Sequence, residues 1–332
     1  MKKAAETLRT ILAETYNIVV TEVSPEGNKV DMKLPSASAE SDDLDSTPTL
    51  RTYQKSLTSV YMEGEFIGRE KELETLSKLL HDDTHHYITI KGFGGMGKTC
   101  LALQAAKNFN SGDILALSLV GTPTLNSVSM KIAQFLSVDA QPDAVIEKLN
   151  GKGTVLFYLD NMEDIKNAND QGDQESKTLM KFFRRMPKNV KILATSRVAL
   201  GWPNEEIVEL DGLTPHDGMQ VFRQWISQRN GEVDDDSAMK LSGLVHGHSL
   251  SLRLLGGVFN NCKESMEQFL SSVLARLPKV VDNDSTVDRH ESINACIKYS
   301  FSNLDPALGS TLGQLKAFEI PFTKTLAERA LG

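Results

Sequence analysis

Short hydrophobic runs alternate with amphipathic stretches between residues 87 and 210. The runs are bounded by polar turns, as expected for strands buried on both faces of a parallel sheet. Strands are expected at 88–90, 114–120, 154–159, 190–194 and 206–210. Helical spacing of hydrophobic residues predicts helices between them at 100–109, 127–136, 142–149 and 178–185. This order predicts an α/β domain with a five-stranded parallel sheet and right-handed crossovers.

Beyond residue 212 the pattern becomes helical, and no strand pattern is evident. Helices are expected at 215–228, 236–245, 249–259, 266–277, 292–301, 306–318 and 324–331. This region therefore reads as a helical bundle that follows the α/β domain.

The first 50 residues differ from the rest of the chain. A helical pattern at 4–15 precedes two strand patterns at 18–23 and 29–34, which form a small helix–hairpin module. Such a module is too small to bury a good core alone, so we expect it to dock onto another element or to act as an adaptor. The polar, acidic stretch 35–50 reads as a flexible linker.

Composition excludes several classes of function. The net charge of −8 disfavours general nucleic-acid binding through the phosphate backbone. No hydrophobic run approaches the roughly 18 residues of a membrane span, and no signal-peptide pattern opens the chain. The three cysteines show no metal-ligand spacing. We therefore expect a cytoplasmic protein with reduced thiols and no membrane partner.

The segment between the first strand and the helix after it carries the clearest chemistry. It follows the pattern G-x-x-x-x-G-K-T from Gly92 to Thr99, called here the phosphate loop. Glycines let the backbone wrap closely around phosphates, and the N–H groups and dipole of the following helix favour an anion. The expected nucleotide contacts are Gly92, Phe93, Gly94, Gly95, Met96, Gly97, Lys98, Thr99 and Cys100. Lys98 supplies charge for the β- and γ-phosphates.

Two further strand ends carry candidate catalytic residues. Asp160 follows a hydrophobic run and would hold Mg²⁺ together with the Thr99 hydroxyl, although strands often end in Asp for turn reasons alone. Glu163 or Asp164 would polarise the attacking water, or both are acids at a helix N-terminus. Arg197 would stabilise the γ-phosphate charge, the alternative being a surface arginine. Parallel sheets bind ligands at the carboxyl ends of their strands, where all these residues fall.

Six motifs occur in an order that resembles the NB-ARC group of STAND signalling ATPases, which contains apoptosome-type and plant-resistance-type switches. They are Phe66-Ile67-Gly68-Arg69-Glu70, the phosphate loop, Leu159-Asp160-Asn161, Leu193-Ala194-Thr195-Ser196-Arg197, Leu210-Asp211-Gly212-Leu213-Thr214-Pro215 and Gly247-His248-Ser249-Leu250-Ser251-Leu252. The resemblance covers about residues 64–332. It implies a P-loop nucleotide-binding domain at 51–212, a helical domain at 213–288 and the start of a winged-helix domain at 289–332.

The resemblance also assigns roles to residues outside the phosphate loop. Phe66, Ile67 and Arg69 would line the adenine pocket, and Ser249 and Leu250 would close over the base and sugar. Ser249 stands where the family usually has proline, which would loosen the contact with the base. The family's histidine on the ADP β-phosphate lies late in the winged helix. We therefore expect the chain to be a piece of a longer protein, ending before that histidine and before a C-terminal sensor.

The implied function is an ATP/ADP switch that uses Mg²⁺. ADP would hold a closed resting monomer, and ATP would drive self-oligomerisation with slow hydrolysis. The N-terminal segment would recruit an unknown effector or adaptor, and the sensor would bind an unknown ligand. Three other classes stay open: an AAA+-type ATPase with steady turnover, an ATP-dependent transcription regulator and a phosphate-loop kinase. The 247–252 motif disfavours the first, and the acidic N-terminal segment without a helix-turn-helix disfavours the second. The kinase would need an acceptor site and a lid, which the sequence does not show.

Overall fold

The computed structural model describes residues 65–120, 122–277 and 286–303. These ranges all fall within one compact unit. The predicted helix–hairpin module, the acidic linker and the predicted helices at 306–318 and 324–331 lie outside the described residues.

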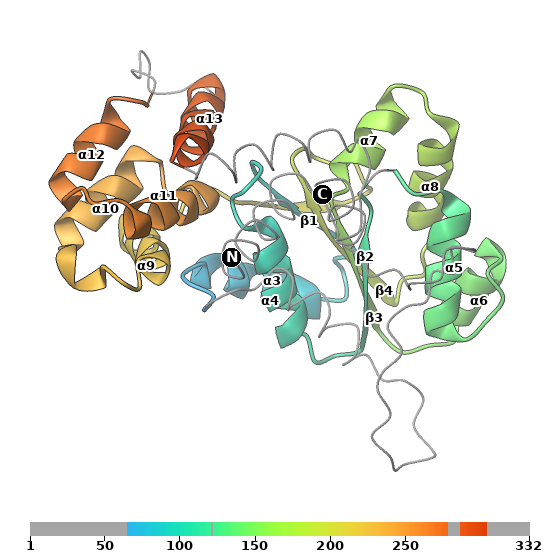
Figure 1. The fold of residues 1–332 in the computed structure, drawn as a ribbon. Helices are drawn as coiled ribbons and strands as arrows, with labels where there is room; N and C mark the ends of the chain where they lie inside the picture. Colours follow the sequence, from blue (N-terminus) through green and yellow to red (C-terminus); the bar gives the residue numbers. More distant parts are fainter. Residues whose placement is uncertain (1–64, 121, 278–285, 304–332) are drawn as a thin grey trace, which may run out of the picture. The chain divides into compact units, whose positions relative to one another are not determined.

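A five-stranded parallel sheet forms the centre of the first half of the described chain (Figure 1). Its strands are β1 (Tyr87–Lys91), β2 (Asp113–Ser118), β3 (Val155–Asp160), β4 (Val190–Ser196) and β5 (Glu205–Glu209). Every pair of neighbouring strands is parallel. The predicted α/β class and strand number are confirmed, with strand ends shifted by a few residues.

The strand order is β2-β3-β4-β1-β5, so β4 lies between β1 and β3. Lys91 at the end of β1 pairs with Ser196, and Leu159 near the end of β3 pairs with Ala194. The residue after β4 is therefore placed between the phosphate loop and the end of β3. The sequence pattern predicted which strands exist but not this order, because pairing is decided by contacts between distant segments.

Helices cover both faces of the sheet (Figure 1). One face packs against α3 (Glu70–His81) and α4 (Lys98–Asn108). The other packs against α5 (Leu125–Leu136), α6 (Pro142–Asn150), α7 (Glu163–Asp170) and α8 (Gln174–Arg184). Alternate residues of β3, namely Val155, Phe157 and Leu159, belong to the hydrophobic cluster under α5–α8, as the two-residue period of a strand requires. The pattern did not separate α7, whose eight residues are mostly polar.

The second half of the described chain is helical, as predicted. It contains α9 (Pro215–Trp225), the short 3₁₀ helix η1 (Asn230–Glu232), α10 (Asp235–Leu244), α11 (Ser249–Asn261), α12 (Met266–Leu274) and α13 (Thr286–Ser302). Their shared core includes Phe222, Phe259 and Phe269 together with Cys296 and Tyr299 of α13. The boundary expected between 288 and 289 therefore falls inside α13, a helix that packs against α11.

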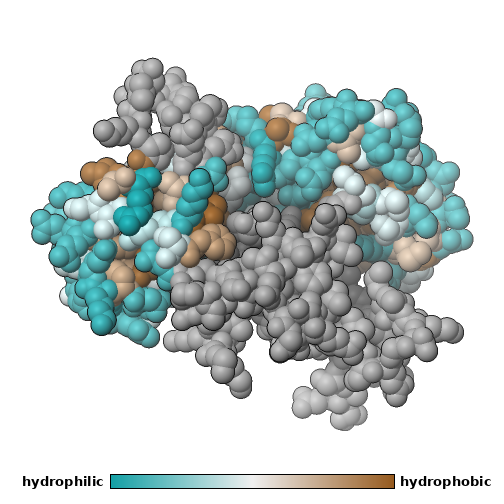
Figure 2. Space-filling model, turned by 45° about the horizontal axis from the view of Figure 1, so that its top comes forward, coloured by the Kyte–Doolittle hydropathy of each residue, from teal (hydrophilic) through white to brown (hydrophobic). Residues whose placement is uncertain are grey.

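The described surface visible in Figure 2 is largely hydrophilic. The exposed large hydrophobic side chains lie on separate elements: Met130, Val198, Ile207 and Leu274. Within the described ranges, no helix combines the length and hydrophobicity needed to cross a membrane.

Candidate functional site

The phosphate loop begins where β1 ends, and its backbone is closely confined. The N–H of Gly92 donates to the Ser196 carbonyl at 3.2 Å. A Cβ at Gly92 would lie 2.8 Å from the carbonyl oxygen of Leu210, so only glycine fits there. Gly97 has a φ of 92° and precedes α4, which begins at Lys98. The helix starts two residues earlier than predicted, so its N–H groups and positive dipole end face the loop.

Lys98 lies folded across the start of the loop. Its Nζ donates to the carbonyls of Gly92 and Phe93, at 2.9 Å each. Burial lowers the pKa of the Lys98 ammonium, with the nearby Arg197 adding to the effect and Glu163 and Asp160 opposing it. A partly desolvated cation of this kind is stabilised by a neighbouring anion, so Lys98 suits the phosphate contact predicted for it.

Asp160 is 6% exposed and accepts three hydroxyl hydrogen bonds at one oxygen. Its Oδ1 lies 3.0 Å from Thr99 Oγ1 and 2.6 Å from both the Tyr158 hydroxyl and Thr195 Oγ1. The two residues predicted to hold Mg²⁺, Thr99 and Asp160, are therefore neighbours. A carboxylate and a hydroxyl are oxygen donors of the kind Mg²⁺ prefers, and the site fits that ion beside a bound phosphate.

A left-handed residue turns the chain from β3 into α7. Asn161 has a φ of 64°, a conformation that asparagine tolerates better than most residues. Its N–H donates to Thr195 Oγ1 at 3.0 Å, and its Nδ2 donates to Asp164 Oδ2 at 2.7 Å. The Asp164 carboxylate is thereby engaged in the turn, which favours Glu163 over Asp164 as the group that faces a water.

Glu163 lies at the N-terminus of α7 and is 6% exposed. Its Oε1 pairs with Arg197 Nε at 3.1 Å, and its Oε2 has no hydrogen-bond partner among the described residues. Burial raises the pKa of this carboxyl, although Lys98 and Arg197 oppose the rise. A Cβ at Gly94 would lie 3.4 Å from Arg197 Nη2, so the guanidinium also borders the phosphate loop. The structure thus brings together all four predicted catalytic side chains: Lys98, Asp160, Glu163 and Arg197.

The predicted adenine-pocket residues lie just before α3, and one of them is bound to the loop. Phe66 and Ile67 are half-buried, and Arg69 is buried. Arg69 donates to the Asp211 carbonyl at 2.6 Å and to the Met96 carbonyl at 3.4 Å. Its guanidinium therefore supports the phosphate loop, and its contact with adenine stays a prediction.

The 247–252 motif, at the start of α11, contacts the tip of the phosphate loop directly. Three of its donors bind three consecutive loop carbonyls: His248 Nε2 binds Gly94 at 2.8 Å, the Leu250 N–H binds Gly95 at 3.0 Å and Ser249 Oγ binds Met96 at 3.3 Å. Sequence reasoning placed Ser249 and Leu250 at the nucleotide but missed His248. The available signal was its position, because a side chain just before a helix is placed to cap it.

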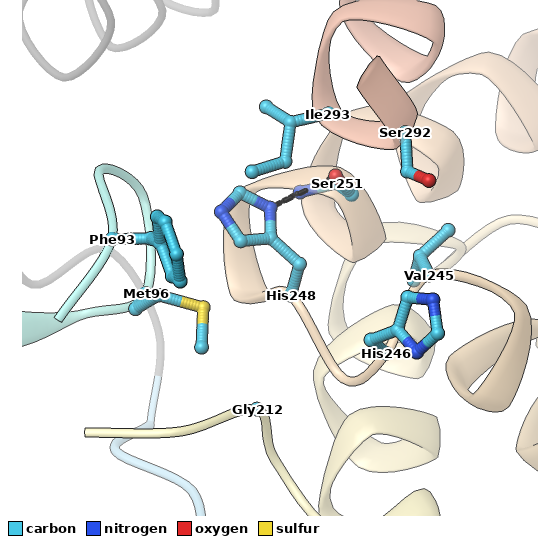
Figure 3. Close-up of a pocket in the computed structure, with 9 residues that line it drawn as sticks. All are labelled: Phe93, Met96, Gly212, Val245, His246, His248, Ser251, Ser292 and Ile293. Carbon is cyan, nitrogen blue, oxygen red and sulfur yellow. Dashed lines mark hydrogen bonds between the residues drawn. The ribbon is translucent and has the colours of Figure 1, made fainter. Parts of the chain in front are cut away.

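A small pocket lies between the loop and the helices (Figure 3). It encloses about 40 Å³, room for only a few water molecules. Phe93 and Met96 line it on the loop side, and Ser292 and Ile293 of α13 line it on the helical side. His248 extends between these two groups.

Comparison with known proteins finds distant relatives. No protein-family model matches the chain. It is 22% identical over 285 residues to the disease resistance protein SUMM2 of Arabidopsis thaliana, a match that covers 78% of this chain and 30% of that protein. It is also 28% identical over 126 residues to an uncharacterised WD-repeat-containing protein of Nostoc sp., covering 32% of this chain and 10% of that one.

Among solved structures, the chain is similar to a STAND protein with a tetratricopeptide-repeat sensor from Pyrococcus horikoshii. The identity is 17% and the TM-score 0.49, over 80% of this chain and 39% of that one. The chain thus spans less than half the length of each of these proteins. The parallel sheet and the phosphate loop show the fold of a P-loop NTPase, and the ordered motifs and the likeness to SUMM2 make the chain similar to the STAND/NB-ARC type.

Proposed function

We propose that the chain is a nucleotide switch, in which ADP and ATP at the phosphate loop favour different arrangements of the α/β domain and the helical bundle. ADP holds the resting, closed state, and ATP releases it. A nucleotide shifts such an equilibrium only if it binds the two arrangements with different affinities. The site must therefore couple the phosphates to the bundle through physical contacts.

The contact between the phosphate loop and the 247–252 motif carries this proposal. Three consecutive loop carbonyls, Gly94 to Met96, accept hydrogen bonds from the start of α11. The N–H groups of the phosphate loop would bind the phosphates, so the same loop would contact both the nucleotide and the bundle. A γ-phosphate that changes the loop conformation therefore changes the geometry of all three bonds. ATP and ADP then differ in how well the loop and the bundle fit each other.

Different side chains of the site bind the phosphates, hold the metal ion and act on the attacking water. Lys98 and the loop N–H groups bind the phosphates, while Thr99 and Asp160 would hold Mg²⁺, which neutralises phosphate charge when bound. Glu163 orients water and accepts its proton, and Arg197 contacts the γ-phosphate. In the structure Arg197 is paired with Glu163, and burial raises the pKa of Glu163. The ion pair has to open before Glu163 can accept a proton from water, so we expect slow hydrolysis that resets the switch.

At the level of the whole protein, the proposal extends to partners. ATP binding would favour self-oligomerisation and so cluster whatever the N-terminal segment recruits. A sensor in a longer protein would control the opening. The motif order and the likeness to SUMM2 support this extension.

The direct test is to denature the purified protein and identify released nucleotide by chromatography. Near-stoichiometric ADP supports a closed, slowly exchanging switch. An empty site combined with rapid steady-state ATP hydrolysis favours the AAA+-type alternative. Failure to bind added ATP or ADP would contradict both.

A further inference from the structure

A line of side-chain contacts connects the phosphate loop to α13. It begins at the Gly94 carbonyl, which lies 2.8 Å from His248 Nε2. The other ring nitrogen, Nδ1, lies 2.9 Å from Ser251 Oγ. Ser251 on α11 also interacts with the Cys296 thiol of α13, the helix that packs against α11. Three side chains therefore join two elements that are about 200 residues apart in sequence.

The proton positions along this line follow from its ends. A carbonyl only accepts, so His248 Nε2 must donate to Gly94. Nδ1 accepts the Ser251 N–H at 3.2 Å, which leaves it without a proton of its own. The Ser251 hydroxyl then donates to Nδ1. Its interaction with Cys296 lowers the pKa of the thiol, against the larger effect of burial. Burial raises the pKa of that thiol to about 11, so it keeps its proton at neutral pH.

The line runs through a closely packed region. His248 is 4% exposed, Ser251 1% and Cys296 2%. A Cβ at Gly95 would lie 2.9 Å from His248 Cε1, so the imidazole rests against the loop backbone. A shift of the loop tip therefore has to move the ring, because no open space separates them. The ring is rigid, and its two nitrogens face opposite partners.

We propose that His248 is a positioning residue that transmits the conformation of the phosphate loop to α13 through Ser251 and Cys296. This inference rests on the proposed switch function and names the side chains that carry its signal. α13 belongs to the core of the bundle through Cys296 and Tyr299, so a change in its seating changes that core. Figure 3 shows the imidazole between the loop residues and Ser292 and Ile293 of α13.

The Cys296 thiol itself provides the readout. The full chain is incubated with Mg-ADP or with a non-hydrolysable Mg-ATP analogue and pulse-labelled with N-ethylmaleimide. Peptide mass spectrometry then quantifies Cys296 separately from Cys100 and Cys262. For the unchanged chain we expect the Cys296 labelling rates in the two nucleotides to differ at least about fivefold.

A matched pair of substitutions isolates His248. In His248→Asn the shorter side chain still caps the Ser251 N–H but cannot reach Gly94. We expect it to bind both nucleotides and to label Cys296 at nearly equal rates. His246→Asn is the control, because His246 is exposed and has a φ of 50° that asparagine tolerates. The control should keep the full ratio.

Ser251→Ala interrupts the line at a second point. It leaves in place the bond from the Ser251 N–H to His248 and the bond from His248 to Gly94. We expect the Cys296 labelling rates in the two nucleotides to become nearly equal in this variant too. Comparing a ratio within one variant cancels any change in overall stability or in thiol reactivity. The inference is overturned if His248→Asn and Ser251→Ala keep the ratio, or if an unchanged chain that binds both nucleotides labels Cys296 equally in each. A chain that binds neither nucleotide would instead overturn the proposed function, and the inference with it.

Discussion

Glu163 and Arg197 form an ion pair in which the two partners differ sharply in exposure. Oε1 and Nε are 3.1 Å apart, and the side chains are 7% and 62% exposed. Lys98 and Arg197 both favour the charge of Glu163, and its other oxygen has no hydrogen-bond partner among the described residues. If Arg197 leaves the ion pair, water can hydrate its exposed guanidinium. The pair therefore opens at little cost to Arg197, which makes a transfer of the guanidinium to a γ-phosphate feasible.

Arg197→Ala is expected to change the response to ATP and to spare ADP. ADP affinity should stay within about twofold, while ATP hydrolysis should fall at least about tenfold, because a charge-stabilising donor is lost. Arg185→Ala is the matched control, since Arg185 is similarly exposed and also pairs with a carboxylate, that of Asp143. Nucleotide titration and a hydrolysis assay provide the measurements. Equal losses of ADP and ATP affinity would argue against a γ-phosphate role.

Glu163→Gln is expected to stabilise the folded protein while slowing hydrolysis. Burial raises the pKa of Glu163 above its ordinary 4.5, so ionisation costs the folded state stability as pH rises through the raised pKa. The variant should therefore melt at a higher temperature than the unchanged chain at neutral pH, and the two should converge below pH 4.5. Thermal melts across pH measure this difference.

Glu175→Gln serves as the control for that series, because Glu175 also lies in the first turn of a helix but is exposed. It should show no such gain at neutral pH. Hydrolysis by the unchanged chain should decline on acidification as Glu163 takes up a proton. A Glu163→Gln variant with unchanged hydrolysis would remove Glu163 from the catalytic role.

Asp160 has a structural as well as a predicted catalytic role, and two substitutions separate them. Asp160→Asn keeps an acceptor for the three hydroxyls but loses the charge, so Mg²⁺ dependence and hydrolysis should fall more than ADP binding does. Asp160→Ala removes the acceptor too and should cost a further 2–4 kcal/mol or so of stability. Denaturant melts and Mg²⁺ titrations distinguish the two. Equal destabilisation by both would point to a structural role alone.

Lys98→Ala is expected to weaken nucleotide binding by about 10- to 100-fold, the effect of losing a charged hydrogen-bond donor. Lys107→Ala on the same helix is the control, because its side chain is exposed away from the loop. A fluorescent ADP analogue measures both. Unchanged affinity in the Lys98 variant would contradict the assignment of the phosphate loop.

Gly95→Ala tests the contact between the loop and the bundle. Gly95 has a φ of 77°, and a Cβ there would lie 2.8 Å from Leu250 Cβ. The substitution should destabilise the protein by about 1–3 kcal/mol. Gly257→Ala in α11 meets no heavy atom within 4 Å and should instead stabilise by about 0.5–1 kcal/mol. Denaturant unfolding of the two variants gives the comparison.

The sequence predicted most of the elements because hydrophobic periodicity is local. It also predicted that Lys98, Asp160 and Arg197 would share one edge of the sheet, since parallel strands end together. The sequence could not predict the strand order β3-β4-β1, nor the position of Arg197 between the phosphate loop and Glu163. Strand pairing depends on the sum of many long-range contacts, which no single segment encodes.

The hydrogen-bond partners of individual side chains also could not be predicted from the sequence. Tyr158 was predicted only as a strand residue and Thr195 only as part of a motif, yet both donate to Asp160. His248 lies in the 247–252 motif, of which only Ser249 and Leu250 were predicted as nucleotide contacts, and its bond to Gly94 spans 154 residues. The polar helix α7 lacks the hydrophobic stripe on which helix prediction depends.

The strand order has a consequence for how the chain acquires its site during synthesis. β1 is the first of the five described sheet strands to be made, and its neighbours in that sheet are β4 and β5. β2 and β3 pair with each other as soon as residue 160 is available, whereas β1 waits until residues 190–209 emerge. A ribosome-bound chain shorter than this has the phosphate loop without the strands that hold it. Nucleotide binding should therefore begin late in translation, only after β4 and β5 have been inserted on either side of β1.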